Sequence, residues 1–239
     1  MSASPLPLEH SGTLPAPQAA PHDHAAGAAP LAHHFENLEQ QHEASTLGMW
    51  AFLATEVLFF GAVFTGYAIY RSCYTEAFVA GSKLLKLWLG TANTAVLISS
   101  SLTVVLALHG ARMGQRRLLV LFLAATMVLG ATFLGIKATE YYIEYEEHLI
   151  PGLDFTPREW PEGVDPRHGE LFFAFYFIMT GLHAVHMLVG MGVLIVVLVL
   201  ACRGHYSARY HTPVELFGLY WHFVDIIWIF LFPLLYLVR

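Results

Sequence analysis

Five segments of this chain are apolar over a length that an ordinary soluble helix does not need. They lie at roughly residues 48–70, 86–109, 118–141, 171–200 and 215–238. The hydrocarbon core of a bilayer is about 30 Å thick, so an α-helix needs about 20 apolar residues to cross it. Each segment is apolar on most sides, whereas a helix on the surface of a soluble protein keeps a polar face. The sequence therefore predicts an all-α, polytopic membrane bundle of five transmembrane helices.

The remaining residues divide into a polar tail and short connections. Residues 1–46 are rich in His, Pro and Ala and cannot bury a core, so we expect a disordered N-terminal tail. Within the tail, residues 35–46 have the composition of a surface helix that leads into the first span. Residues 47–239 form the predicted membrane domain. The formal net charge of -6 comes without any basic block, which excludes nucleic acid as an expected partner.

The distribution of arginine predicts the orientation. Loops that stay in the cytoplasm carry an excess of Lys and Arg. Two short connections, between spans two and three and between spans four and five, contain Arg112, Arg116, Arg117, Arg203 and Arg209. We therefore expect both connections and the N-terminus to be cytoplasmic, and the C-terminus to be on the outer side.

Several ionisable side chains lie inside the apolar segments. They are Glu56 in the first, His183 and His186 in the fourth, and His222 and Asp225 in the fifth. At about 1.5 Å per residue, each lies about 10–15 Å from the predicted cytoplasmic end of its helix. Residues three apart are neighbours on a helix surface, so each pair is expected to share a face. The sequence predicts one polar layer in the inner half of the membrane, joined by Ser99, Ser100 and Ser101 of the second span.

The spacing of these groups leaves three interpretations open. Two histidines and two carboxylates are suitable metal ligands. Ionisable residues in spans also form proton or transport paths, and buried polar groups fasten helices together. At the other end of the third span, Lys137 and Glu140 are one turn apart. We expect them to pair near the outer surface, with the lysine extending to the interface.

Several stretches resemble subunit III of the heme-copper terminal oxidases, in its short five-helix bacterial form. They are "GMWAFLATEVLFFGAVFTGYAIYR", "TANTAVLISSSLTVVLALHG", "FLGIKATEYY", "FYFIMTGLHAVHMLVG" and "VELFGLYWHFVDIIWIFLFPLLYL". The resemblance covers about residues 46–238 and includes every span in order. The last two stretches are the most specific.

The resemblance implies an accessory, non-redox subunit of an aerobic respiratory oxidase in the bacterial inner membrane. Such a subunit packs on the catalytic subunit I, with subunit II and other respiratory-complex subunits nearby. It stabilises subunit I, supports proton uptake for oxygen reduction and binds structural phospholipid. It holds no metal, because haem and copper belong to partner subunits. Cytochrome c is the favoured electron donor of the complex; a quinol oxidase or a nitric-oxide-reductase-associated homologue is the alternative.

The resemblance also implies which residues belong to family motifs. Glu56 takes the place of the family's carbodiimide-reactive carboxylate. His183, His186, Glu215, Trp221, His222 and Asp225 fall in the two specific stretches, and Glu140 falls in the third span's motif. None is expected to be catalytic. Two alternatives of other classes remain: an independent membrane transporter for protons or solutes that uses the polar layer, and a membrane metalloprotein.

Overall fold

The computed structural model describes residues 37–152, 155–157, 160–208 and 210–238. The predicted disordered tail lies outside them up to residue 36. Six α-helices follow one another: α1 (Leu38–Cys73), α2 (Thr75–Leu84), α3 (Leu87–Arg112), α4 (Arg116–Glu146), α5 (Pro166–Cys202) and α6 (Thr212–Tyr236). Among the described residues the only β-structure is one isolated bridge, between Ser207 and Tyr210. The all-α prediction is confirmed.

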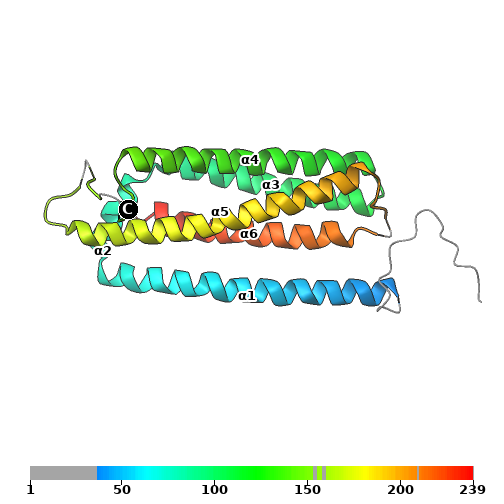
Figure 1. The fold of residues 1–239 in the computed structure, drawn as a ribbon, viewed down its shortest axis with the longest axis horizontal. Coiled ribbons are helices and arrows are strands. Elements are labelled where there is room, and N and C mark those ends of the chain that lie inside the picture. The colour runs from blue at the N-terminus through cyan, green and yellow to red at the C-terminus, as the bar shows by residue number, and fades with distance from the viewer. Residues whose placement is uncertain (1–36, 153–154, 158–159, 209, 239) are drawn as a thin grey trace, which may run out of the picture. The chain divides into compact units, whose positions relative to one another are not determined.

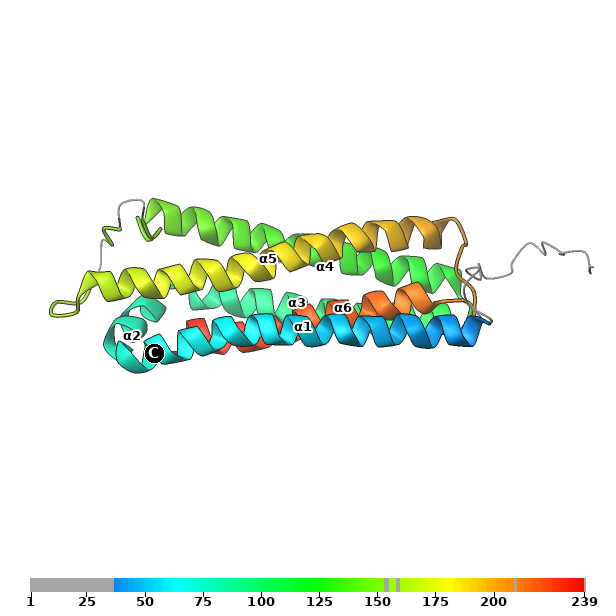
Figure 2. The ribbon, with the colours of Figure 1, turned by 60° about the horizontal axis from the view of Figure 1, so that its bottom comes forward.

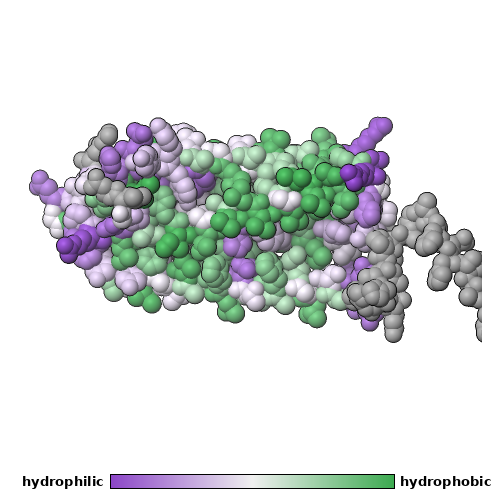
Figure 3. All heavy atoms as spheres, in the orientation of Figure 1, coloured by the Kyte–Doolittle hydropathy of each residue, from purple (hydrophilic) through white to green (hydrophobic). Residues whose placement is uncertain are grey.

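Five of the six helices are long and apolar enough to cross a membrane, as predicted, and α2 is the exception. The space-filling view shows apolar side chains along the middle of the bundle and hydrophilic ones gathered at its two ends (Figure 3). A belt of this kind matches a bilayer core about 30 Å thick between two polar interfaces. The protein is a multi-pass membrane protein.

Local sequence signals explain where the helices begin and end. Asn37 caps α1 by accepting a hydrogen bond from the Gln40 backbone N–H at 2.8 Å. From residue 38 onward, the segment expected to form a surface helix leading into the first span is the start of α1, because it contains good helix formers and no Gly or Pro. Gly114 and Gly204 follow α3 and α5 with φ of 67° and 78°, a backbone conformation that suits glycine.

Helix α6 lies at the centre of the bundle and packs against α3, α5 and α1 (Figures 1 and 2). It buries 56% of its most apolar stretch, whereas α1 buries 11%. Helices α3 and α4 form an antiparallel pair through the turn at residues 113–115. The central position of α6 brings its polar side chains into contact with three neighbouring helices.

The short helix α2 was not predicted from the sequence. It lies at the end of the bundle where α1 ends and packs on α5 (Figure 2). Gly81 allows the close approach: a Cβ atom there would lie 2.3 Å from Cδ1 of Phe172. Its ten residues are too few to span a membrane, so a search for long apolar segments passes over it.

Candidate functional site

Glu56 of α1 and His186 of α5 contact each other directly. Glu56 Oε2 lies 3.0 Å from His186 Nε2, and both side chains are 18% exposed. The other ring nitrogen, Nδ1, donates to the Leu182 carbonyl at 2.8 Å. The Phe60 ring packs against the imidazole at an interplanar angle of 60°, with ring centroids 5.1 Å apart. An acid in the first span is therefore partnered by protein at the junction of α1 and α5.

The hydrogen bonding of His186 determines what this pair can do chemically. Because Nδ1–H donates to a carbonyl, a neutral ring leaves Nε2 as an acceptor, and Glu56 must then carry the proton. The other arrangement is an imidazolium beside a carboxylate. In both arrangements one proton lies between Oε2 and Nε2, and the pair as a whole is neutral. This neutrality lowers the cost of placing an acid inside the membrane.

His222 and Asp225 lie on the other side of α6, against α3. His222 Nδ1 is 2.8 Å from Ser101 Oγ. Asp225 is 4% exposed, and its two carboxyl oxygens have no hydrogen-bond partner at bonding geometry within the described part of the chain. Ser101 is the hydroxyl that lies beside this carboxyl as well. These three residues form a second polar group, separate from the Glu56–His186 pair.

His183 is isolated from both groups. It is 1% exposed, and neither of its ring nitrogens meets a hydrogen-bond partner among the residues described. Its ring lies between Phe133 of α4 and Trp228 of α6, at centroid distances of 5.5 and 5.2 Å. His183 thus faces the centre of the bundle, while His186 faces α1.

The expected single polar layer is therefore divided into three parts. Three residues turn a helix by about 300°, so two side chains at this spacing point about 60° apart. In a bundle this angle is enough to direct them to different neighbouring helices, as it does for His183 and His186. Across the described residues, no three His, Cys, Asp or Glu side chains are arranged to hold a metal ion. The roles proposed for these five residues remain predictions.

Glu215 connects three helices at the end of the bundle where α6 begins. It pairs with Arg112 of α3, Nη2 to Oε1 at 2.8 Å. His211 Nε2 lies 3.3 Å from the same oxygen, and His42 Nε2 of α1 lies 3.9 Å from Oε2. His42 also contacts Thr212 Oγ1 at 3.1 Å. The contacts of Glu215 are consistent with a fastening role at the membrane surface.

Trp221 fills the space left by two glycines on neighbouring helices. Its side chain is fully buried and donates through Nε1 to Ser100 Oγ at 3.1 Å. A Cβ atom at Gly130 of α4 or Gly190 of α5 would lie 3.1 or 3.2 Å from the indole ring. Trp221 therefore acts as the packing centre of α3, α4, α5 and α6.

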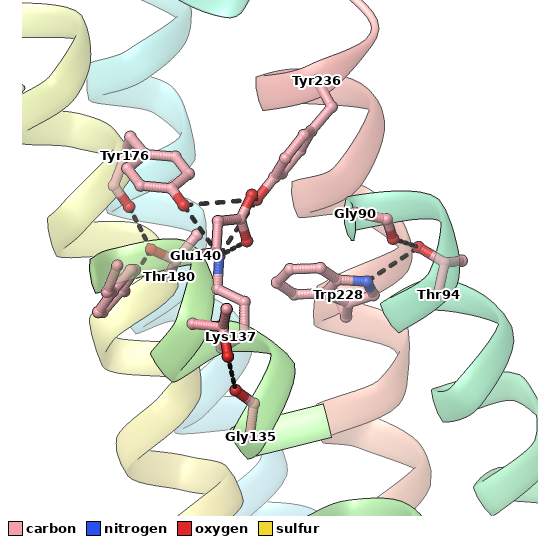
Figure 4. A network of polar contacts seen from close by, with 11 residues as sticks. Gly90, Thr94, Gly135, Lys137, Glu140, Tyr176, Thr180, Trp228 and Tyr236 are labelled. Carbon is pink, nitrogen blue, oxygen red and sulfur yellow. Dashed lines mark hydrogen bonds and ion pairs between the residues drawn. The ribbon is translucent and has the colours of Figure 1, made fainter. Parts of the chain in front are cut away.

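Lys137 and Glu140 are buried, which contradicts the expectation of an exposed pair at the interface. They are 3% and 1% exposed, with Nζ 2.8 Å from Glu140 Oε2. Nζ also donates to the hydroxyls of Tyr176 and Tyr236 at 3.0 and 3.1 Å, and Tyr236 donates to Glu140 Oε1 at 2.7 Å (Figure 4). Four aromatic rings lie within 5.8 Å of Nζ. The predicted pairing of Lys137 with Glu140 is therefore confirmed, but the face of α4 that carries it is turned toward the inside of the bundle.

A signal for this buried cluster is present in the sequence. Lys137, Glu140 and Glu144 are spaced i, i+3 and i+7, which is one helix face, and Phe133 one turn earlier lies on the same face. All four are buried in the structure. Tyr176 and Tyr236 could not be assigned to the cluster, because their approach depends on how α5 and α6 pack.

The fold and its polar interior together define an α-helical polytopic membrane protein with paired ionisable groups between the helices. The family model described as "Cytochrome c oxidase subunit III" matches residues 166–238, which include α5 and α6. The chain belongs to the cytochrome c oxidase subunit III family of the heme-copper oxidases.

Three relatives illustrate the range of the similarity. Cytochrome c oxidase subunit 3 of Thermostichus vulcanus is 32% identical over 193 residues, which cover 80% of this chain and 86% of the relative. The subunit of the same name in Latimeria chalumnae is 33% identical over 202 residues, or 79% and 67% of the two chains. Cytochrome bo(3) ubiquinol oxidase subunit 3 of Pseudomonas aeruginosa is 28% identical over 215 residues, or 90% and 95%.

Proposed function

We propose that this chain is the accessory, non-redox subunit III of an aerobic respiratory heme-copper oxidase in a bacterial inner membrane. The observation that carries the proposal is the similarity to oxidase subunits III over four fifths or more of both chains. In this function the chain stabilises the catalytic subunit I and supports its supply of protons. Haem and copper reside in the partner subunits, and this chain contributes helices and structural phospholipid contacts.

The polar contacts between helices support a stabilising role. Glu56 with His186, His222 with Ser101, and Glu215 with Arg112 each connect two different helices. Polar contacts between helices inside the membrane, such as the first two, contribute on the order of 1 kcal/mol each to helix association, and an exposed pair such as Glu215 with Arg112 contributes at most about 1 kcal/mol. Glu56 and His186 are in addition the pair that can exchange a proton without a change in total charge. We assign to this pair the proton-linked part of the function.

Cytochrome c is the electron donor that we propose for the complex. The cytochrome c oxidase subunits are 32–33% identical to this chain, and the Pseudomonas aeruginosa ubiquinol oxidase subunit is 28% identical. The second candidate is a ubiquinol oxidase, which is favoured by the 95% coverage of that relative. The donor binds elsewhere in the complex in either case.

The orientation follows from where the arginines gather. Arg116 at the start of α4 donates to the carbonyls of Ala201 and Cys202 at the end of α5, so the two arginine-bearing connections lie side by side. Arg112 is held close by through Glu215. This clustering supports a cytoplasmic location for that end and for the start of α1, and a periplasmic location for the end of α6.

Copurification tests the proposal. An affinity-tagged chain expressed in its own host is extracted in a mild detergent, and the subunits, haem spectrum and oxygen consumption are recorded with reduced cytochrome c and with ubiquinol. We expect haem-containing partner subunits and oxygen consumption with cytochrome c. Activity with ubiquinol alone would favour the second candidate. Recovery of the tagged chain without haem-containing partners would overturn the subunit assignment and favour an independent transporter.

A further inference from the structure

A groove runs along the outside of the bundle between α3 and α6. It consists of two hollows, of about 380 and 300 Å³, and His222 lines both of them. The groove extends from Arg112 and Glu215 at one end to Thr94 and Ile229 beyond the middle of the membrane. Its walls are formed by side chains about one turn apart on α3 and α6, and His42 and Thr46 near the start of α1 also line the hollow beside Arg112 and Glu215. The groove is therefore elongated, and a single helix lying parallel to α3 and α6 would fit its shape.

The rim of the groove is apolar and exposed. Five aliphatic side chains on it are 49–59% exposed: Ile98, Leu102 and Val105 of α3, and Ile226 and Ile229 of α6. Small exposed residues also follow one another every fourth position on α3, at Thr91, Ala95 and Ser99. The hydroxyls of Thr91 and Ser99 bond to carbonyls of their own helix, so they present little polarity outward. A surface of this kind allows another helix to approach closely.

The floor of the groove is polar, although it lies at the middle of the membrane. His222 Nδ1 is engaged by Ser101, while Nε2 has no hydrogen-bond partner in the described part of the chain. About one turn further along α6 lies Asp225, whose buried carboxyl oxygens make no hydrogen bond at full bonding geometry in the described part of the chain. Ser101 lies beside both groups. A group that hydrogen-bonds His222 Nε2 would fix the ring tautomer, and through it the direction of the Ser101 hydroxyl toward or away from Asp225.

The depth of this floor decides between a lipid and a protein as the occupant. At about 1.5 Å per residue, Asp225 lies about 20 Å from the start of α6 and about 17 Å from its end. Lipid headgroups stay about 15 Å from the midplane of a core about 30 Å thick, and acyl chains have no hydrogen-bonding groups. A polar side chain on a neighbouring transmembrane helix can reach the floor. The polar groups of α1 do not require a partner from a neighbouring subunit, because Glu56 and His186 bond to each other.

From the groove, its apolar rim and the unsatisfied polar floor, we infer that the α3–α6 groove holds one transmembrane helix of a neighbouring oxidase subunit. That helix carries a hydroxyl or amide side chain at the level of His222. Either group can donate to or accept from Nε2 and so complete the chain through Ser101 to Asp225. This inference rests on the proposed function and adds to it the face by which the subunit docks.

Photo-crosslinking at the rim tests the inference in the assembled complex. Benzoylphenylalanine is introduced at Ile98 or Ile226, and at Val128 of α4 as the matched control. Val128 is aliphatic, 64% exposed and at a similar distance from the start of its helix. The tagged complex is purified, irradiated and analysed by mass spectrometry. We expect covalent adducts between a neighbouring oxidase subunit and both groove positions, and none of that kind from Val128.

The other outcomes are equally informative. If the bulky residue at Ile98 or Ile226 prevents copurification, while the Val128 variant enters the complex and all three chains are equally helical, steric exclusion from the groove supports the inference. An intact complex in which the groove positions give only lipid adducts, or adducts with a second copy of this chain, overturns it and leaves the proposed function standing. If the native tagged chain itself brings down no oxidase subunits, the proposed function fails, and the docking inference fails with it.

Discussion

Removal of Lys137 is the perturbation for which the structure permits the most detailed prediction. Its ammonium group has three N–H donors, and three acceptors meet them within 3.1 Å: Glu140, Tyr176 and Tyr236. In Lys137→Met, Glu140 keeps only the hydrogen bond from Tyr236, and its charge is left buried without a counterion. Breaking a buried pair from one side costs about 3–5 kcal/mol. We expect Lys137→Met to lower the free energy of unfolding by that amount.

Unfolding in mixed detergent micelles, followed by circular dichroism, measures this cost. The double variant Lys137→Met/Glu140→Leu removes both charges and fills the site with apolar atoms, so it should be less destabilised than Lys137→Met alone. Lys86→Met is the control, because Lys86 and Glu147 form a pair of the same 2.8 Å length with 42% and 32% exposed side chains. An exposed pair contributes at most about 1 kcal/mol.

Two results would refute this reasoning. A Lys137→Met variant as stable as Lys86→Met would mean that the buried pair is hydrated in the membrane and is not enclosed by its four aromatic neighbours. A double variant whose loss of stability equals the sum of the losses in Lys137→Met and in the single variant Glu140→Leu would mean that the two charges do not interact. Either result would remove the basis for describing this cluster as a desolvated ion pair.

Three further substitutions test other parts of the bundle. Glu56→Gln should leave the complex assembled and change oxygen consumption only modestly, since the amide can still donate to His186 Nε2. Loss of all activity in a complex with full haem content would contradict this. His222→Leu should reduce the yield of the complex more than the activity of each complex formed, because it removes the hydrogen-bond partner of Ser101. A normal yield would be the contrary result. Gly81→Ala should lower the free energy of unfolding by about 1–3 kcal/mol through the clash with Phe172. Gly61→Ala is the control and should not lower it, because nothing lies within 4 Å of a Cβ atom at Gly61. Equal stability of the two variants would argue against the α2–α5 contact.

The chemistry of the Glu56–His186 pair bears on how a membrane helix tolerates an acid. The two groups share one proton, which can move between Oε2 and Nε2 while the total charge of the pair stays at zero. The Leu182 carbonyl makes this possible by engaging the other ring nitrogen. A change at Leu182 that moved its carbonyl would therefore alter the pair without touching either ionisable side chain.

The sequence alone determined the number of spans, because the length of an apolar run is set by bilayer thickness and needs no knowledge of neighbours. It also placed Glu56, His183, His186, His222 and Asp225 within the apolar spans, since the position of a residue along its own helix needs no knowledge of neighbours. It could not show α2, which is too short to span, nor that Lys137 and Glu140 face inward rather than toward the interface.

Which groups meet was decided only by the tertiary structure. Residues three apart on one helix, such as His183 and His186, are close in sequence and in depth, yet they face different neighbours because about 60° of rotation separates them. The partner of each depends on which helices pack beside it and at what angle. Helix packing arises from side chains distributed over the whole chain, among them Trp221 against Gly130 and Gly190, and no local pattern contains that information.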